Sequence, residues 1–278
     1  MRLIVQPGDG LVPIIDAIDE ARRRVDIVIF RFDRPKLEAA LARAVERGVP
    51  VRALIAHTNR GGEDHLRRLE LRLLERGVMV SRTADDLVRY HGKMLLVDER
   101  LFVLGFNFTK LDIEKSRSFG LVTDTPSLVA AAEDLFQADS TRRMYTAGRD
   151  QDFVVSPQLS RVTLTQFIRS ARKQLLIYDA KLSDPGMLRL LRAKQGEGVE
   201  VRVIGKVGKG APLDAVRLEG IRLHVRAIVV DGREVFIGSQ SLRNLELDGR
   251  REIGLICREP AIARRVAQVF EKDRRGLS

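Results

Sequence analysis

The sequence predicts an α/β protein made of two pseudo-symmetric halves, each a mixed, mostly parallel sheet flanked by helices. Two observations lead to this prediction. Amphipathic helical segments alternate with short β-rich segments along the 278 residues. The same succession of segments also occurs twice. An apolar share of 44% and a charged share of 31% are typical of a globular protein with a buried core.

The first two repeated segments each combine a helix with a strand. An amphipathic helix followed by a β-rich run reads IIDAIDEARRRVDIVIFRF at 14–32 and LTQFIRSARKQLLIYDAKL at 164–182. A helix that ends at a glycine, followed by an alternating strand, occupies 37–55 and again 188–204. The order of elements is therefore the same in both halves.

A third pair of similar segments is ELRLLERGVMV at 70–80 and DAVRLEGIRLHV at 214–225. The first half has an insertion or longer loop before this segment, at 57–70. The two halves meet in a polar, glycine-containing stretch at 139–153. We therefore expect two domains, residues 1–148 and residues 149–278.

The fourth repeat contains the residues that suggest a function. HGKMLLVDERLFVLG at 91–105 matches HVRAIVVDGREVFIG at 224–238. A single copy could be an edge strand with stray polar residues, but such residues are not expected to recur at matched positions of a duplicated unit. Three residue pairs are each separated by 133 positions: His91 and His224, Asp98 and Asp231, and Gly105 and Gly238.

The spacing inside each motif groups its side chains. Two residues separated by one position share a face of a strand, so His91 and Lys93 point the same way. Asp98 is expected either to lean to the other face of the strand or to lie past its end, and to brace the turn or a neighbouring element while belonging to the catalytic motif. The second motif repeats this arrangement with His224, Arg226 and Asp231.

Two such motifs brought together supply two imidazoles and two cations. The cations, Lys93 and Arg226, suit phosphate oxygens and offset charge at a pentacoordinate phosphorus. One imidazole can attack phosphorus, while the other donates a proton to the leaving oxygen and later acts as a base. The sequence contains no His/Cys/Asp cluster with metal-ligand spacing, so we expect neither a metal nor another cofactor.

Two HxKxxxxD-type motifs, each followed by a Gly-Ser-x-Asn-like turn, resemble the phospholipase D superfamily, and bacterial cardiolipin-synthase-like proteins in particular. The resemblance covers nearly the whole chain. It implies a phospholipase D-like fold, a phosphohistidine intermediate, and an active site on the pseudo-two-fold axis between the halves. By this analogy His91 is the expected nucleophile and His224 the acid and base, whereas an orienting carboxylate beside His224 would make His224 the more basic imidazole. Both orders of the two roles are open from the sequence.

The chain departs from the family pattern in several places. Arg226 replaces the second lysine; it keeps the charge and can bind phosphate in a bidentate way. The turn GFNFT (105–109) has Asn107 but is one residue short, and GSQSL (238–242) has Ser239 but Ser241 where the family has asparagine. Asn107 and Ser239 are expected to support phosphate binding.

The family also places an acid after each turn, where it orients a motif histidine. Glu252 fits this position in the second half and is expected to serve His224. The first half has Ser118 instead, so His91 lacks an obvious acid. Asp112 and Glu114 are both open as substitutes.

Charge and composition indicate the class of partner. The formal net charge is +11, which favours an anionic phosphodiester. No apolar run reaches the roughly 18 residues of a spanning helix, and the N-terminus lacks the apolar core of a signal peptide. We expect a cytoplasmic monomer that forms an internal pseudo-dimer, with peripheral contact at the inner membrane face as a further possibility.

Three functions remain open from the sequence. The first is a phosphodiesterase or phosphatidyltransferase acting on phospholipid headgroups. The second is a nuclease-type phosphodiesterase, although an aromatic content of 5% and the absence of tryptophan count against a dedicated single-strand binder. The third is a degenerate relative that only binds anionic phosphate. A narrow apolar tunnel would favour acyl chains, whereas an open basic groove would favour nucleic acid.

Overall fold

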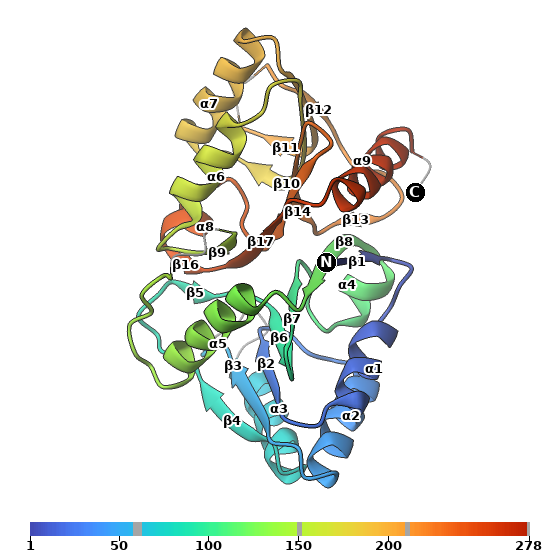
Figure 1. The fold of residues 1–278 in the computed structure, drawn as a ribbon, viewed down its shortest axis with the longest axis vertical. Coiled ribbons are helices and arrows are strands. Elements are labelled where there is room, and N and C mark those ends of the chain that lie inside the picture. Colours follow the sequence, from blue (N-terminus) through green and yellow to red (C-terminus); the bar gives the residue numbers. More distant parts are fainter. Residues whose placement is uncertain (58–62, 149–151, 209–211, 277–278) are drawn as a thin grey trace.

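The structure, a computed structural model, describes residues 1–57, 63–148, 152–208 and 212–276. Two α/β halves are stacked along the longest axis of the molecule (Figure 1). In that view, α1 and α2 lie to the right of the lower sheet, and α6 and α7 lie to the left of the upper one. Helices α5 and α9 lie on the opposite sides, as two-fold related halves require. The predicted fold class, two pseudo-symmetric α/β halves, is confirmed.

The first half forms a sheet in the order β1-β8-β7-β6-β2-β3-β4. Its elements are β1 (Arg2–Gln6), α1 (Val12–Glu20), β2 (Val25–Ile29), α2 (Pro35–Glu46), β3 (Val51–Ile55), α3 (Glu63–Glu75), β4 (Met79–Arg82), β5 (Arg89–Tyr90), β6 (Met94–Val97), β7 (Arg100–Leu104), α4 (Lys110–Glu114), β8 (Ser116–Thr123) and α5 (Pro126–Ser140).

The second half forms a sheet in the order β12-β11-β10-β14-β15-β17-β9. Its elements are β9 (Phe153–Val155), α6 (Ser160–Arg169), β10 (Gln174–Leu182), α7 (Pro185–Gly196), β11 (Glu200–Val207), β12 (Asp214–Val216), β13 (Arg222–Leu223), β14 (Arg226–Val230), β15 (Glu234–Gly238), α8 (Asn244–Asp248), β16 (Arg250–Arg251), β17 (Ile253–Cys257) and α9 (Pro260–Arg274). The predicted boundary after residue 148 stays a prediction, because residues 149–151 lie outside the described part.

Both sheets are mixed as predicted, but antiparallel pairings outnumber parallel ones among the described strands. Parallel pairs occur where a helix or long connection joins the strands, as for β2 with β3 and β10 with β11. Strands β6 and β7, and likewise β14 and β15, are joined by tight turns and are therefore antiparallel. The expectation of mostly parallel sheets was wrong because it overlooked these hairpins.

The third repeat also differs from the prediction. Residues 70–80 belong to α3 and the start of β4, whereas residues 214–225 contain β12, a non-helical stretch and β13. Strand β12 pairs in parallel with β11, as β4 does with β3. The second half thus keeps the strand at this position and has no helix equivalent to α3 in the described residues.

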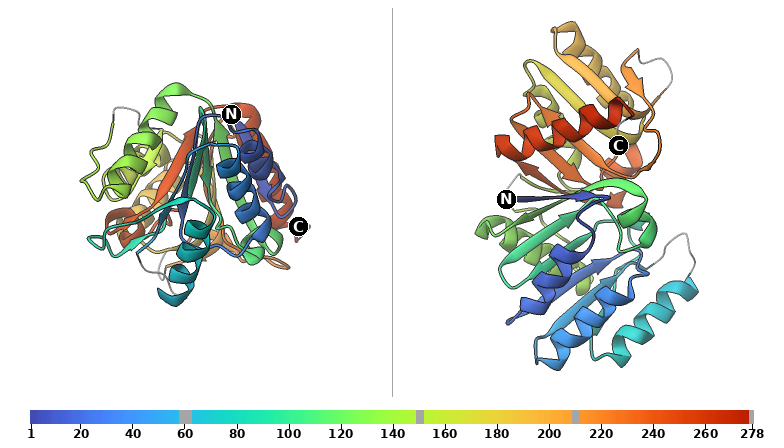
Figure 2. Two further views of the ribbon diagram at one scale, coloured as in Figure 1. Left: turned by 90° about the horizontal axis from the view of Figure 1, so that it is seen from below. Right: turned by 90° about the vertical axis from the view of Figure 1, so that its right-hand side faces the viewer.

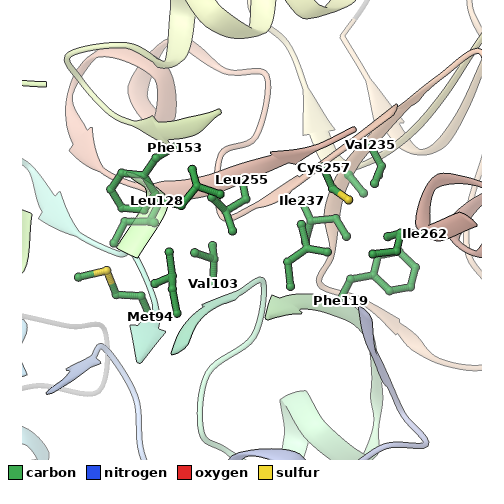
Figure 3. Close-up of a cluster of buried hydrophobic side chains, with 14 of the residues drawn as sticks. Met94, Val103, Phe119, Leu128, Phe153, Val235, Ile237, Leu255, Cys257 and Ile262 are labelled. Atoms are coloured by element: carbon green, nitrogen blue, oxygen red, sulfur yellow. The ribbon is translucent and has the colours of Figure 1, made fainter. Parts of the chain in front are cut away.

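An apolar cluster joins the two halves (Figure 3). It lies where β7 and β8 of the first sheet meet β15 and β17 of the second. Residues from both halves are almost fully buried in it, including Met94, Val103 and Phe119 from one half and Ile237 and Leu255 from the other. The halves therefore share a core, and a site between them lies on a packed foundation.

Two buried ion pairs cross between the halves in matching positions. Arg117 of β8 donates to both carboxylate oxygens of Asp273 on α9, at 2.7 and 2.9 Å. Arg251 of β16 does the same to Asp139 on α5, at 3.0 Å for both bonds. The side view in Figure 2 shows α9 lying on the second half above the first. Each half thus supplies one buried arginine to the other half's helix.

Candidate active site

Two short strands carry the motif histidines across the junction between the halves. Strand β5 pairs with β16 of the other half, and β13 pairs with β8. His91 and Gly92 follow β5, and their backbone N–H groups donate to the Arg251 carbonyl at 2.7 and 2.9 Å. His224 follows β13 and donates in the same way to the Arg117 carbonyl at 3.2 Å. Each histidine is therefore held by backbone of the opposite half.

Both imidazoles line one pocket of about 280 Å³. Among the residues that the structure describes, six arginines and two glutamates also line it, and Phe30 is the only apolar side chain there. The full lining is Phe30, Arg31, Arg89, His91, Asn107, Arg222, His224, Arg226, Ser239, Arg243, Glu246, Arg250 and Glu252. Such a lining suits a densely charged anion rather than an apolar chain.

His91 lies between a carboxylate and an ammonium group. Its Nδ1 is 2.9 Å from Glu252 Oε2. Lys93 Nζ is 3.0 Å from His91 Nε2 and donates to the His91 carbonyl at 2.6 Å. Lys93 is 1% exposed, and its ammonium group also lies 5.6 Å from the centre of the Phe30 ring. The predicted contact between His91 and Lys93 exists, although β6 begins only at Met94.

His224 has a different carboxylate. Its Nδ1 lies 3.6 Å from Asp112 Oδ2, an ion-pair contact slightly too long for a hydrogen bond. Asp112 Oδ2 accepts from the backbone and side-chain nitrogens of Asn107 at 2.9 and 2.6 Å, and its Oδ1 accepts from Arg222 at 2.5 Å. Arg226 donates to the His224 carbonyl at 2.6 Å and to Ser241 at 3.1 Å.

The expected pairing of acids and histidines was therefore wrong. Glu252 was assigned to His224 within the second half, but it contacts His91 of the first half. Asp112 does serve as an orienting acid, but for His224. Glu114 points elsewhere and pairs with Arg34 at 3.2 Å. Sequence comparison within one half could not anticipate this crossing, because it depends on how the halves dock.

The predicted supporting residues Asn107 and Ser239 both line the pocket. Asn107 is 4% exposed, lines the pocket and binds Asp112. Ser239 also lines the pocket, accepts from the Ile253 N–H at 3.1 Å and lies beside Glu252. Ser118, which holds the place of Glu252 in the first half, is fully buried.

Asp98 and Asp231 brace turns, as predicted. Asp98 accepts from the backbone N–H groups of residues 22–24, just before β2, at 2.8 to 3.3 Å. Asp231 accepts from those of residues 172–174, around the start of β10, at 2.7 to 2.9 Å. Both residues have positive φ, 52° and 53°, at the tip of the hairpin that follows each motif strand. Neither lines the pocket.

Burial and neighbouring charges shift the site's protonation equilibria. Burial, Lys93 and Arg226 all lower the pKa of His91 well below its usual value. Burial also lowers the pKa of His224, but the Asp112 carboxylate opposes this change. Burial lowers the pKa of Lys93 to about 7, although Glu252 opposes it.

The two carboxylates are shifted in opposite directions. Burial raises the pKa of Glu252, with Lys93 opposing the change. Burial has the same effect on Asp112, but His224 and the two bonds from Asn107 outweigh it, so the pKa of Asp112 falls below its usual value. Such opposed shifts in one pocket are typical of acid–base sites.

The sequence analysis missed several pocket residues. Phe30 makes an edge contact with the His91 ring, with the two ring centres 4.7 Å apart. The guanidinium groups of Arg31 and Arg89 lie 5.8 and 5.6 Å from the centre of the Phe30 ring. Arg89 and Arg222 occupy matched places, each two residues before a motif histidine, and that spacing could have identified them. Glu246 and Arg243 gave no comparable signal.

The described residues contain neither a metal-binding cluster nor a membrane-spanning helix. No cluster of three or more His, Cys, Asp or Glu side chains is arranged there to hold a metal ion. No helix in the same part of the chain is both long enough and apolar enough to cross a bilayer.

Comparisons with known proteins identify the family and the fold. The family model described as cardiolipin synthase, PLD-like domain, matches residues 14–140 and 164–274. The structure resembles polyphosphate kinase from Porphyromonas gingivalis with a TM-score of 0.81 at 18% identity, over 99% of this chain and 47% of that one. It also resembles phosphatidylserine synthase from Haemophilus influenzae with a TM-score of 0.72 at 13% identity, over 99% and 85% of the two chains.

These structural likenesses concern the fold, since both identities are low. The chain spans about half the length of the polyphosphate kinase that it matches. No curated protein matches the sequence.

Proposed function

The chain belongs to the phospholipase D-like family described for cardiolipin synthase, and from this premise we propose that it is a metal-independent phosphodiesterase or phosphatidyltransferase that works through a phosphohistidine. The observation that carries the proposal is the arginine-lined pocket with two imidazoles, each beside a carboxylate of the opposite half. An enzyme of this kind needs a nucleophile, a proton donor and fixed positive charge around one phosphate.

The two imidazole environments suit different roles. Glu252 accepts the Nδ1 proton of His91, which leaves the Nε2 lone pair for attack on phosphorus. Burial, together with the charges of Lys93 and Arg226, lowers the pKa of His91 and keeps it neutral. Burial lowers the pKa of His224, and the ionised Asp112 beside it acts in the opposite direction and stabilises the protonated form. We therefore assign His91 as nucleophile and His224 as general acid and base.

The reaction has two steps. His91 Nε2 attacks phosphorus, the bond from phosphorus to the leaving oxygen breaks, and His224 gives its proton to that oxygen. Water or an acceptor alcohol then gives a proton to His224 while its oxygen attacks phosphorus. The phosphorus–nitrogen bond breaks in this second step and His91 returns to its starting state.

Lys93 and Arg226 are assigned to the nonbridging phosphate oxygens, since each lies next to one motif histidine. Negative charge on these oxygens grows as five-coordinate phosphorus forms, so fixed cations stabilise the transition state more than the substrate. Asn107 holds the Asp112 carboxylate through a hydrogen bond, and Ser239 lies beside Glu252 and is itself held by the Ile253 N–H.

Phospholipid headgroups remain the first substrate candidate because the matching family is described for cardiolipin synthase. With Phe30 as the only apolar lining residue, the pocket would take the headgroup and leave acyl chains outside. The six lining arginines favour a second candidate, a nucleic acid, whose repeated phosphates would occupy several of them. Turnover of phosphatidylglycerol vesicles and of single-stranded DNA, each with EDTA present, separates the two.

The mechanism is tested by trapping the intermediate. A ³²P-labelled p-nitrophenyl phosphodiester is mixed with the His224→Ala variant and quenched in base, under which phosphohistidine survives. We expect a burst of p-nitrophenol equal to the enzyme concentration and label on the peptide that contains His91. Steady turnover should fall by at least about 10³-fold, because no base remains for the second step.

Label on His224 in the wild type would reverse the assignment of roles. Full turnover by His91→Ala would overturn the phosphohistidine mechanism altogether. A wild-type protein that binds phosphodiesters without turning them over would instead be a degenerate phosphate-binding relative.

A further inference from the structure

A second basic cavity lies on the second half, between helices α6 and α7. These helices pack against each other on the left of the upper sheet in Figure 1. The cavity has a volume of about 610 Å³, and its lining includes Arg169, Arg172, Arg189, Lys194 and Glu197. It shares no described lining residue with the pocket of the motif histidines, so the two sites are separate.

The guanidinium groups around this cavity are not engaged by the protein. Arg169, Arg172 and Arg189 are exposed, and their side chains form no hydrogen bond or ion pair within the described part of the chain. Lys194 is 3% exposed and donates to Glu197 at 2.5 Å and to the Arg169 carbonyl at 3.2 Å. Lys194 therefore balances the charge of Glu197, and the three guanidinium charges stay uncompensated.

The matching helices of the first half are joined by an ion pair at this place. Helices α2 and α7 begin at matched prolines that are 150 positions apart. At the same separation, Asp19 of α1 matches Arg169 of α6. Arg43 of α2, which matches Ala193 of α7, donates to both carboxylate oxygens of Asp19 at 3.0 and 2.7 Å. The second half has lost both members of this pair, and a cavity lies between its helices instead.

The chemistry of the lining suits phosphate groups on a small molecule. Guanidinium groups bind phosphate oxygens in a bidentate way. A volume of about 610 Å³ is typical of a small-molecule site and leaves room for more than one phosphate. The described lining has no aromatic side chain on which a nucleic-acid base could stack. Leu190 and Ala193 are its apolar members, which is little surface for a lipid chain.

We propose that the cavity between α6 and α7 is an accessory site for a soluble, compact polyanion that carries at least two phosphate groups. Arg169, Arg172 and Arg189 bind the phosphates. The bound ligand ties α6 to α7, as the ion pair of Asp19 and Arg43 ties α1 to α2. The site lies outside the histidine pocket, so its ligand binding is independent of the proposed catalysis.

Hydrogen exchange on the full-length protein tests where a polyanion binds. Pyrophosphate is the probe, with EDTA present and with sodium chloride at matched ionic strength as the reference. Exchange in segments 165–172 and 186–197 should slow by about 10-fold when pyrophosphate is at ten times its Kd, because bound ligand suppresses local opening. Unchanged exchange in both segments at about 10 mM pyrophosphate would overturn the proposal, since even a Kd of about 1 mM gives protection there.

The first half supplies the design of a closed variant. Arg169→Asp combined with Ala193→Arg introduces the ion pair that α1 and α2 already contain, so the helices should still pack. The protection of α6 and α7 by pyrophosphate should weaken by at least about 10-fold, because one phosphate ligand is lost and the cavity is bridged. Protection equal to that of the wild type would overturn the proposal.

Two single variants complete this test. Arg192→Ala lowers the net charge by one, as the closed variant does, but Arg192 is exposed on α7 and does not line the cavity. Its affinity should change by less than about 2-fold, because the lost charge acts only through screened solvent. Arg189→Ala leaves α6 unaltered and should weaken binding more than Arg192→Ala does. Equal affinities of these two variants would show a general charge effect and overturn the site.

Vesicles separate a soluble ligand from a lipid headgroup. Cosedimentation with vesicles of equimolar phosphatidylcholine and phosphatidic acid should be the same for the wild type and the closed variant. Vesicle binding that the closed variant loses, together with no protection by pyrophosphate, would overturn the assignment of a soluble ligand and place the phosphate on a membrane lipid.

Discussion

The two sides of the pocket contain the same types of residue in different arrangements. On the His91 side, Glu252 of the opposite half, which lies between β16 and β17, forms a 2.9 Å hydrogen bond with the imidazole. On the His224 side, a helix residue of the opposite half, Asp112, lies 3.6 Å away. Each half therefore has two places from which an acid can reach the other half's histidine, one on the short helix α4 or α8 and one that follows it in the chain, and each histidine uses a different one.

This difference shows how a symmetric scaffold can support an asymmetric reaction. A nucleophile and a proton donor need different protonation states, which identical surroundings would not provide. The first half has Ser118 at the position that matches Glu252, so the His224 side has no acid from that position. The helix acid then becomes the neighbour of His224, and Arg222 and Asn107 keep it ionised.

The largest loss of activity should come from neutralising Glu252 and Asp112 in separate variants. Glu252→Gln should lower kcat/KM by about 10³ to 10⁴-fold, because His91 then loses the bond that fixes its tautomer. Asp112→Asn should cost about 10²-fold, because its contact is longer and acts through protonation. Stopped-flow kinetics on both variants measures this ratio.

The two acid variants should also differ in pH dependence. Without its Asp112 partner, His224 holds its proton less tightly, so the falling alkaline limb of kcat/KM should move to lower pH in Asp112→Asn. Equal losses and equal pH profiles for the two variants would contradict the division of roles.

The next largest effect concerns the cation of the first motif. Lys93→Met should lower kcat/KM by about 10² to 10³-fold through lost charge at the phosphate. In the free enzyme the pKa of Lys93 is about 7, so its charge is lost as pH rises above that value. KM should therefore rise above pH 7 in the wild type.

The matched control for this prediction is Lys93→Arg, which stays charged. Its KM should remain flat over the same pH range, whatever its absolute activity. A wild-type KM that is constant from pH 6 to 9 would contradict a titrating lysine.

A smaller effect concerns the stability of the junction. Arg251→Met should reduce the free energy of unfolding by about 3 kcal/mol, because Asp139 is left buried and unpaired. Burial raises the pKa of Asp139 to about 6 from its ordinary 3.8, so the folded state binds this proton more tightly than the unfolded state. The stability contribution of Asp139 therefore falls as pH rises from about 4 through 6.

The pH dependence gives this experiment its control. The loss caused by Arg251→Met should be larger at pH 8 than at pH 5, where Asp139 can take up a proton instead. Arg117→Met, on the opposite side of the junction, should cost a similar amount by urea denaturation. A markedly unequal pair of values would show that the two sides of the junction are not equivalent.

The smallest effect is a loss of stability when the turn-bracing aspartates Asp98 and Asp231 are neutralised, and it should be equal in the two halves. Asp98→Asn and Asp231→Asn should each cost about 1 to 2 kcal/mol of stability, because each carboxylate accepts backbone hydrogen bonds. Burial raises the pKa of each aspartate, but the backbone hydrogen bonds outweigh burial and lower the pKa below its usual value. Their contribution is therefore present above the ordinary pKa and is lost as pH falls through the depressed one.

Urea denaturation at pH 7 and pH 3 measures this effect. The difference between each aspartate variant and the wild type should shrink at the lower pH. A large loss of activity without a loss of stability would contradict a purely bracing role for Asp98 or Asp231.

Much of the fold and part of the site could be predicted from the sequence. The constant spacing of 133 between motif residues identified the duplication, and the period-two pattern placed His91 beside Lys93. The bracing role of Asp98 also followed from its position past the strand. These features depend on local geometry, which a single sequence contains.

The missed features depend on contacts between distant segments. Glu252 and His91 are 161 residues apart and meet only because β5 pairs with β16 across the junction. The hairpins that make the sheets mostly antiparallel follow from short turns at Asp98 and Asp231, whose significance was not recognised. Glu246 could not be identified as a pocket residue, because its burial depends on how the chain folds around α8.

The paired ion bridges at the junction have a consequence for how the protein can be divided. Separate expression of residues 1–148 would leave Arg117 without Asp273, and expression of residues 149–278 would leave Arg251 without Asp139. Each fragment would also expose half of a shared apolar core. The fragments should therefore be insoluble alone yet able to rescue each other when co-expressed, so this single polypeptide is in physical terms an obligate dimer whose subunits are joined by a peptide bond.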